Sequence, residues 1–380
     1  MSGVQVRSAG KVLRIGDTLD EALYGLADDN RSSVLLMAEG QRIETPHQLR
    51  RLQEAGFAVE MPRREDASSR STTGASTSGG AHHDFSRRIQ QAVETRKGLV
   101  GAVNKLMHRI RDGAVPDIGL LQAASDQLAS GVASDPQAHA ALAYLLRCND
   151  YTVEHSADVA VLMVATGRVL GLPQSDLPLV SMAGLMHDVG KQRVPEHILN
   201  KPDRLTSGEY ECVKKHPTQA LEILGDWKDC PQAVRETAVR HHERLDGSGY
   251  PDGLAGDQID TYSKLAAVAD SFDAMTARRV YSVGVPPRLA LKELYGHRET
   301  LFDSECVHAL IKLIGVYPVG TRVLLASGDS GVVAAPNSTD TTQPTVLVDR
   351  DRRGRALDIP FLADWRQSTC RIVGTTAEAG

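Results

Sequence analysis

Residues 178–191 read PLVSMAGLMHDVGK, and this stretch decides the fold class. The run before His187 is apolar on nearly every side, which predicts a helix buried all round. Its last turn delivers His187 and Asp188, and Gly190 follows as the expected C-terminal stop. A histidine beside an aspartate is costly to bury unless the pair is partnered or binds a metal. The stretch therefore predicts a helical core with polar chemistry at one end of a buried helix.

Helical periodicity continues on both sides of this stretch, over about residues 84–315. For example, Val153, Ala157, Ala160 and Val164 recur at i, i+4, i+7 and i+11, the spacing of one helix face. Residues 84–315 are therefore predicted to form one all-α domain.

The segments outside this domain have different patterns. Residues 62–83 are rich in Ser, Thr, Gly and Arg, which is typical of a flexible linker. Residues 1–61 combine strand-like runs such as SVLLMAEGQRI with the helical pattern TPHQLRRLQEAG, and indicate a small α+β domain. Residues 316–380 contain short β-type runs between Gly, Asp, Asn and Pro. The predicted fold is mainly α, with a small N-terminal α+β domain and a small C-terminal β appendage.

The composition narrows the class of protein. The 380 residues are 41% apolar and 24% charged, which fits a soluble globular protein. A net charge of -5 provides no overall basic field for binding a nucleic-acid polymer. The five cysteines form no CxxC pair, which argues against a disulfide framework and a thiolate zinc site. No signal peptide or membrane-spanning run is found, so we expect a cytoplasmic protein.

Further histidines lie where helices are expected to end or to bury a face. His155 lies in a predicted helix, His216 precedes Pro217, and residues 241–251 read HHERLDGSGYP. Each has an ordinary structural interpretation. Taken alone, a histidine such as His155 is more often a core residue whose hydrogen bonds are satisfied. A pair such as His241 and His242, taken alone, more often lies in solvent at the end of a helix. The glycine-rich bend after the pair also has a structural interpretation, as a turn.

Taken together, these residues indicate a metal site. The run SKLAAVADSFDAM at 263–275 places Asp270 and Asp273 at i, i+3 on one face of an apolar helix. The helical domain thus supplies five imidazoles and at least two carboxylates, more donors than one divalent ion needs. A two-metal site of this kind suits hydrolysis of a phosphodiester.

These motifs resemble the HD-GYP subgroup of the HD-domain metal-dependent phosphohydrolases. His155, the pair His187 and Asp188, and Asp270 are similar to the H…HD…D quartet of the wider superfamily. LMHDVGK, the KHP that contains His216, HHERLDGSGYP and ADSFDAM follow in the order found in the subgroup. The resemblance covers roughly residues 140–315.

The resemblance implies a phosphodiesterase that hydrolyses the bacterial second messenger cyclic di-GMP to linear pGpG, and further to GMP in some members. It implies two divalent metals, iron or manganese, with Asp188 bridging them. Lys191 would contact the phosphate or assist the leaving oxygen, and Arg279 and Tyr250 would lie at the substrate. The implied ligands of one metal are His155, His187 and Asp270, and those of the other are His216, His241 and His242.

Two positions depart from the family pattern. Some members have a Glu where this chain has Tyr151, and that Glu helps to hold a third metal. In RRVYSV at 278–283 the expected Arg is present as Arg279, whereas Ser282 replaces a Lys. We therefore expect two metals per chain and an altered affinity for the substrate phosphate.

Two other functions stay open from the sequence. One is a cyclic-dinucleotide sensor or scaffold that binds without turnover and acts through signalling proteins, although the full ligand set argues against it. The other is a phosphodiesterase that prefers cyclic GMP-AMP, which sequence does not separate from the first. The native metal and the input signal stay open, as does the oligomeric state, with a dimer as one alternative.

Overall fold

The computed structural model describes residues 23–26, 33–37, 79–114, 118–145, 151–201, 203–277, 284–337, 340–363 and 368–376. Side chains are described from Arg87 onward within these ranges, except at positions 151, 152 and 358. The chain divides between Ser76 and Thr77 into two compact units. Each unit is considered by itself.

In the first unit the strands β1 (Leu23–Leu26) and β2 (Ser33–Met37) pair antiparallel, with Leu26 opposite Ser33. Strand β2 starts the predicted run SVLLMAEGQRI. The predicted helix TPHQLRRLQEAG lies outside the described residues.

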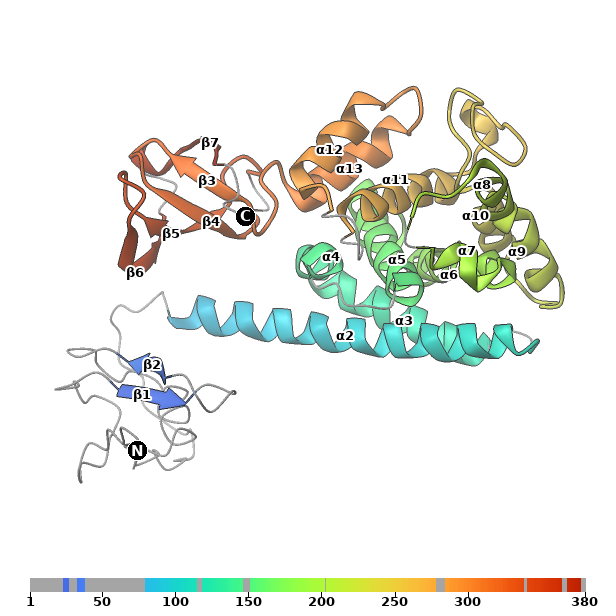
Figure 1. Ribbon diagram of the computed structural model, residues 1–380, viewed down its shortest axis with the longest axis horizontal. Helices are drawn as coiled ribbons and strands as arrows, with labels where there is room; N and C mark the ends of the chain where they lie inside the picture. Colours follow the sequence, from blue (N-terminus) through green and yellow to red (C-terminus); the bar gives the residue numbers. More distant parts are fainter. Residues whose placement is uncertain are drawn as a thin grey trace. The chain divides into compact units, whose positions relative to one another are not determined.

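The second unit is mainly helical (Figure 1). Its first helix begins at Gly79, inside the segment 62–83 that the composition predicts to be a linker. The helices are α2 (Gly79–Arg111), α3 (Ile118–Ser134), α4 (Pro136–Leu145), α5 (Tyr151–Leu170), α6 (Leu177–Met186), α7 (Glu196–Leu199), α8 (Ser207–Val213), α9 (His216–Gly225), α10 (Gln232–Arg240), α11 (Thr261–Thr276), α12 (Pro287–Gly296) and α13 (Ser304–Ile314).

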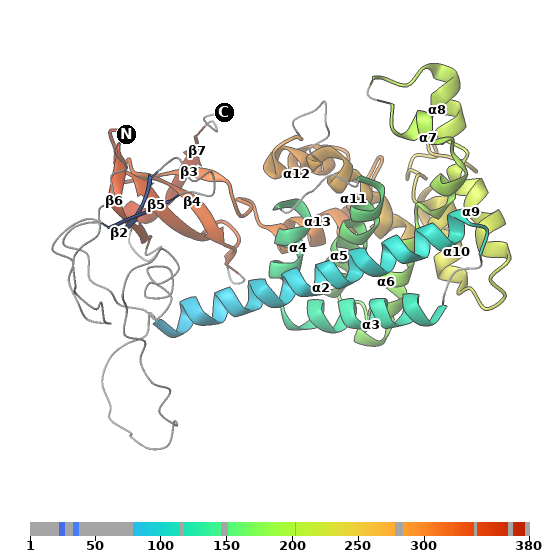
Figure 2. The same ribbon diagram turned by 60° about the horizontal axis from the view of Figure 1, so that its bottom comes forward.

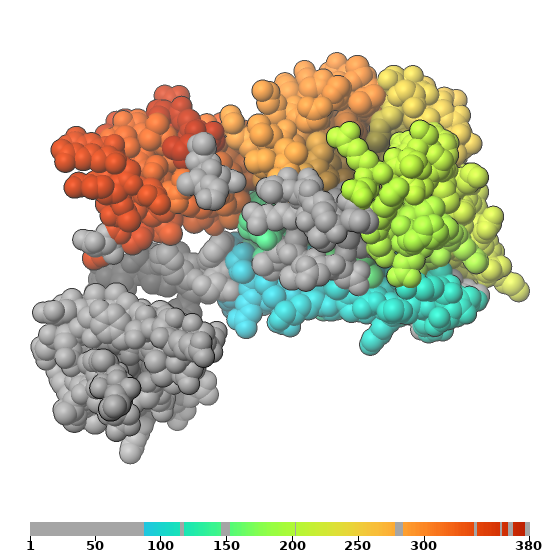
Figure 3. All heavy atoms as spheres, viewed as in Figure 1, coloured from blue at the N-terminus to red at the C-terminus, as the bar shows by residue number. Residues whose placement is uncertain are grey.

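Helices α5 and α6 form the centre of the helical core. They pack against each other, and α13, α4, α11 and α2 surround α5, as Figures 1 and 2 show. In α5 the apolar residues from Ala157 to Ala165 are almost completely buried. In α6 the residues from Val180 to Met186 are all buried, which confirms the helix predicted from PLVSMAGLMHDVGK. The long helix α2 runs along α3 and α5, and its surface, drawn in cyan, lines one edge of the helical part in Figure 3.

Two local expectations near this core are wrong. Helix α6 ends at Met186, four residues before Gly190, and Gly190 does not have the positive φ of a helix stop. Instead, a Cβ at Gly190 would lie 1.8 Å from the carbonyl oxygen of His216, so glycine is needed for the close approach of α9. His216 begins a helix and does not end one, because Pro217 is well tolerated in a first helical turn.

Side-chain caps set the start of two helices near the site. Thr206 and Glu209 form a capping box at the start of α8. Asp260 caps α11 by accepting hydrogen bonds from the backbone N–H groups of Tyr262 and Ser263, at 3.0 and 2.9 Å. The α11 cap places Asp270 and Asp273 two to three turns into the helix.

The C-terminal part forms a five-stranded antiparallel sheet in the order β6-β5-β4-β3-β7. Val323, Leu325, Val333, Val346 and Val348 form its own small core. The structure therefore confirms the predicted class, mainly α with a C-terminal β appendage. The strands are β3 (Arg322–Leu325), β4 (Ser330–Ala335), β5 (Thr345–Arg350), β6 (Ala356–Leu362) and β7 (Ile372–Thr375). Within the described residues, no helix has the length and apolar content needed to span a bilayer.

Candidate metal centre

The seven side chains predicted as metal ligands come together inside the helical domain. All are buried except His242, which is half-buried. Five helices place them: His155 lies in α5, His187 and Asp188 follow α6, His216 begins α9, His241 and His242 follow α10, and Asp270 lies in α11. Residues more than 100 positions apart in the chain therefore meet at one point.

Asp188 lies at the centre of the group. Its Oδ2 is 3.3 Å from Nε2 of His155 and 3.3 Å from Nε2 of His187. Its Oδ1 is 3.3 Å from Nε2 of His216 and 3.7 Å from Nε2 of His241. Each carboxylate oxygen therefore faces its own pair of imidazoles.

The remaining two donors extend the group on either side. Oδ1 of Asp270 lies 3.2 Å from Nε2 of His155. The His242 ring lies 4.1 Å from the His241 ring and 5.0 Å from the His216 ring, between centroids. The donor atoms fall into two sets in which all members lie within 4.8 Å of one another: His155, His187 and Asp188, and His216, His241 and His242.

Hydrogen bonds at Nδ1 fix the orientation of four of these rings. Three Nδ1 atoms donate to backbone carbonyls: His187 to Gly184 at 2.7 Å, His216 to Val213 at 2.7 Å and His241 to Thr237 at 3.1 Å. Nδ1 of His155 donates to Oδ2 of Asp273 at 2.7 Å. A carbonyl only accepts, so Nδ1 of those three rings carries the proton and Nε2 of each neutral ring presents a lone pair. This is the arrangement that outer partners impose on metal-binding histidines.

Several atoms that face the centre of the group lack the hydrogen-bond partners that buried polar atoms normally have. Nε2 of His187 and Oδ1 of Asp188 are buried without a hydrogen bond. Nε2 of His216 lies 3.3 Å from Nε2 of His241, and in neutral rings held at Nδ1 this places two lone pairs face to face. Such atoms are costly to bury unless a cation lies among them. The donor set therefore fits divalent metal ions.

The electrostatics of the site agree with this fit. Burial lowers the pKa of His216 and His241, and it lowers the pKa of His242 to about 3. These rings are neutral at pH 7, the form that binds metals. Burial also acts to lower the pKa of His155, but hydrogen bonds to Asp188, Asp270 and Asp273 outweigh it and hold this pKa well above its ordinary value. The carboxylate side of the site therefore attracts positive charge.

Asp273 holds one of the donor rings in place, a role that the sequence pattern alone does not assign to it. Its carboxylate is buried and holds Nδ1 of His155. The sequence feature that could have indicated this role is the spacing of Asp273 from Asp270, since both lie on one face of an otherwise apolar helix. Only Asp270 reaches the donor group, while Asp273 acts one step behind it.

We expect Asp273→Asn to weaken metal binding by about 10- to 100-fold, because the neutral amide makes His155 a poorer donor. Competition of Mn²⁺ against a fluorescent chelator measures this affinity. Asp229→Asn, at an exposed position in the same domain, is the matched control and should leave the affinity unchanged. An unaltered Mn²⁺ affinity in Asp273→Asn would show that Asp273 does not support His155.

Lys191 and Tyr250 lie at the edge of the donor group. Nζ of Lys191 hydrogen-bonds to Oδ2 of Asp188, and its side chain is 20% exposed. The Tyr250 ring stacks on His242 with 4.7 Å between centroids and 28° between planes. Both side chains therefore lie in direct contact with members of the donor group.

The loop that carries Tyr250 is held by the buried carboxylate of Glu243. This carboxylate accepts hydrogen bonds from the backbone N–H groups of Asp252 at 2.8 Å and Leu254 at 3.0 Å. Gly247 has φ of +77°, as expected for a residue that needs glycine's conformational freedom. Gly249 is required for another reason: a Cβ there would lie 2.5 Å from the backbone of Glu243.

The side chains of three residues with predicted roles are not among those that the structure describes. Arg279 and Ser282 are outside the described residues. Tyr151 begins α5, but its side chain is not among those described. Their predicted roles stay predictions.

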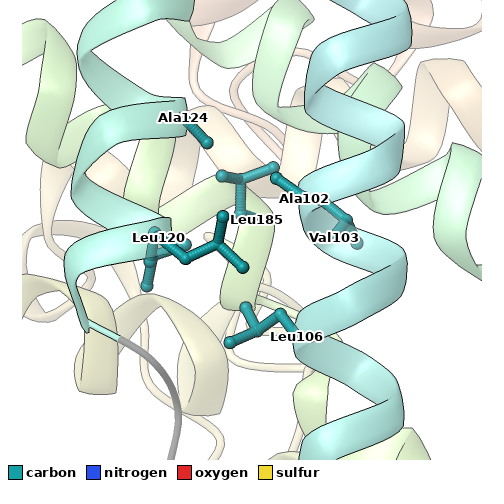
Figure 4. Close-up of a pocket in the computed structure, with 7 residues that line it drawn as sticks. Ala102, Val103, Leu106, Leu120, Ala124 and Leu185 are labelled. Carbon is teal, nitrogen blue, oxygen red and sulfur yellow. The ribbon is translucent and has the colours of Figure 1, made fainter.

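A hollow elsewhere in the helical domain shares no lining residue with the donor group. It lies between α2, α3 and α6 (Figure 4). Every side chain that lines it is apolar: Ala102, Val103, Leu106, Leu120, Leu121, Ala124 and Leu185. It offers no group that could bind a metal or act on a phosphate.

Comparison with known proteins places the site in a family. The sequence profile of the HD domain family matches residues 142–306. A cyclic di-GMP phosphodiesterase of Pseudomonas aeruginosa is 36% identical over 278 residues, which are 72% of this chain and 66% of that protein. The cyclic di-GMP phosphodiesterase response regulator RpfG of Xanthomonas campestris is 42% identical over 144 residues, 38% of each chain. A 3′3′-cGAMP-specific phosphodiesterase of Vibrio cholerae is 37% identical over 169 residues, 44% of this chain and 36% of that protein.

The chain thus spans 66%, 38% and 36% of the lengths of these three relatives. All seven donor residues lie inside the stretch 142–306 that the family profile matches. The same stretch contains the H…HD…D quartet and the motifs LMHDVGK and HHERLDGSGYP in their expected order. The chain therefore belongs to the HD domain family, in its HD-GYP subgroup.

Proposed function

We propose that this chain is a metal-dependent phosphodiesterase that hydrolyses cyclic di-GMP to linear pGpG, and the product analysis below decides whether GMP also forms. The observation that carries the proposal is the placement of Asp188, whose two carboxylate oxygens each face a pair of imidazoles. The names of the relatives from Pseudomonas and Xanthomonas support the substrate.

The ligand roles follow from the two donor sets. Asp188 would be shared between two divalent ions. His155, His187 and Asp270 would complete one site, and His216, His241 and His242 the other. When bound, the ions would supply Lewis-acid polarisation of the phosphate oxygens and an acidified water as nucleophile.

The remaining residues would either contact the substrate or hold the imidazoles in place. The Lys191 ammonium, held beside Asp188, can bind a phosphate oxygen and hold a proton at Nζ near the oxygen that leaves. Tyr250 would form part of the substrate surface beside His242, and Arg279 would contact phosphate. Asp273 and the three backbone carbonyls keep the imidazoles turned inward.

Two ions per chain are expected, with iron or manganese as the native metal. The seven donors suffice for two ions that share Asp188. A phenol at position 151 is a poor third-site ligand because its reference pKa is about 10. Elemental analysis of protein purified anaerobically from iron-replete cells should give a value near two, and a reproducible value near three would contradict the assignment.

The substrate assignment is tested with a panel of cyclic dinucleotides. Protein loaded with Fe²⁺ or Mn²⁺ is incubated with cyclic di-GMP and with 3′3′-cGAMP, and the products are resolved by chromatography beside chelator-treated protein. Metal-dependent formation of pGpG supports the proposal. Faster turnover of 3′3′-cGAMP would favour the specificity named for the Vibrio relative. Binding of either compound without turnover would favour a sensor or scaffold. The cytoplasmic location, other signalling partners and oligomeric state stay predictions.

A further inference from the structure

Lys214 is a cation near the metal centre that the ligand assignment does not use. It follows α8 and lies two residues before His216. Its Nζ lies 5.2 Å from the centre of the Tyr250 ring and 5.9 Å from the centre of the Tyr210 ring, within the range of cation–π attraction. The Lys214 side chain is 31% exposed, so a ligand in solution can reach its ammonium group.

Tyr250 connects Lys214 to the metal centre. The Tyr250 ring stacks on His242 at 4.7 Å between centroids. The ammonium group therefore lies two ring contacts from a donor imidazole.

Among the residues that the structure describes, the charge of Lys214 is only weakly engaged. Its ion pair is with Oε1 of Glu211 at 3.4 Å, and the Glu211 side chain is 64% exposed. Exposed pairs of this kind contribute little, because water screens them and both side chains lose freedom. The aromatic faces attract the ammonium without neutralising it. Lys214 can therefore exchange Glu211 for an anionic ligand at small cost.

We propose that Lys214 binds the second phosphate of a cyclic dinucleotide whose first phosphate lies at the metal centre. This inference rests on the proposed function. The two phosphodiesters of such a substrate belong to one ring, so when the first lies at Asp188 the second must lie within the width of that ring. Lys191 contacts Asp188 and serves the first phosphate. Lys214, beyond His242 and Tyr250, provides a charge-assisted hydrogen bond to the second.

The test compares a substrate that has two phosphates with one that has a single phosphodiester. We expect Lys214→Ala to raise the KM for cyclic di-GMP by about tenfold and to leave kcat unchanged, because the lost bond is made equally in the bound substrate and the transition state. Its rate with bis(p-nitrophenyl) phosphate should equal that of the wild type. Lys214→Arg should retain most of the affinity, and Glu211→Gln should lower the KM by releasing Lys214.

Lys215→Ala is the matched control, since Lys215 is the exposed neighbour of the same charge. It should change neither substrate's kinetics. If wild-type protein cleaves cyclic di-GMP and Lys214→Ala keeps the wild-type KM, this inference fails while the proposed function stands. An equal loss on both substrates would assign Lys214 to holding Tyr250 in place and would also overturn it. If the metal-loaded wild type leaves cyclic di-GMP uncleaved, the proposed function itself fails.

Discussion

Asp188→Ala should abolish hydrolysis of cyclic di-GMP and lower the metal content of the purified protein. Removal of the carboxylate leaves two sets of imidazoles without the anion that both oxygens of Asp188 provide. Loss of one electrostatic donor in an active site costs about 10²- to 10³-fold in rate. We expect a larger loss here, because the metals depart as well. Turnover by chromatography and metal by elemental analysis measure the two effects.

Two further variants make this result interpretable. Asp188→Asn keeps the shape of the side chain and removes its charge, so it should show the same loss if charge is the cause. Asp257→Ala replaces a fully exposed carboxylate and should keep both activity and metal. Circular dichroism of each variant establishes that the helical domain is folded. Near wild-type turnover in folded Asp188→Ala would remove the basis of the metal mechanism.

Arg96→Met should lower the free energy of unfolding by about 3–5 kcal/mol, because it removes the cation that forms two hydrogen bonds with a buried carboxylate. Arg96 of α2 forms two hydrogen bonds with Asp158 of α5, Nε to Oδ1 at 2.8 Å and Nη2 to Oδ2 at 2.9 Å. A third contact joins Nη2 to Glu154 at 3.4 Å. The Asp158 side chain is only 2% exposed and that of Arg96 12%. The pair fastens α2 to the helix that carries His155.

Urea denaturation of metal-free protein, followed by circular dichroism, measures this effect. Lys97→Met is the matched control on the same helix, since the side chains of the Lys97–Glu94 pair are 67% and 65% exposed. It should cost less than about 1 kcal/mol. The double variant Arg96→Met with Asp158→Asn should regain part of the loss, because it also removes the buried negative charge that Arg96 balances. A change in Arg96→Met no larger than that in Lys97→Met would show that the buried pair is not a stabilising contact.

The donor residues themselves were accessible from the sequence. A run such as PLVSMAGLMHDVGK has one consistent interpretation, a helix buried on all sides, because no face of it is polar enough for water. Histidines and aspartates at the ends and faces of such helices must then meet one another or a cation. Residue types and helical periodicity were therefore enough to predict an all-α domain that supplies five imidazoles and at least two carboxylates. The resemblance to the HD-GYP subgroup was needed to select Asp188 and the six side chains that lie near it.

Other predictions were wrong or incomplete where a contact between residues far apart in the sequence decides the local structure. Gly190 was expected to end a helix, but it is glycine because the His216 carbonyl approaches it from another helix. Asp273 was noted without a role, since its partner His155 lies 118 residues away. The loop role of Glu243 was not recognised, because its contacts are with backbone amides that any sequence could present.

The sequence by itself determined the helical class of the domain and the residue types that can bind metal, because helical periodicity and donor chemistry are properties of neighbouring residues. The tertiary structure alone decided which nitrogen of His155, His187, His216 and His241 faces Asp188, since that depends on the carbonyls and the carboxylate brought to Nδ1 by the packing. It also decided that Lys214 lies over the Tyr250 ring and that Arg96 reaches Asp158. These contacts join segments that are distant in the sequence, and local sequence does not encode the distance between two such segments until the core is packed.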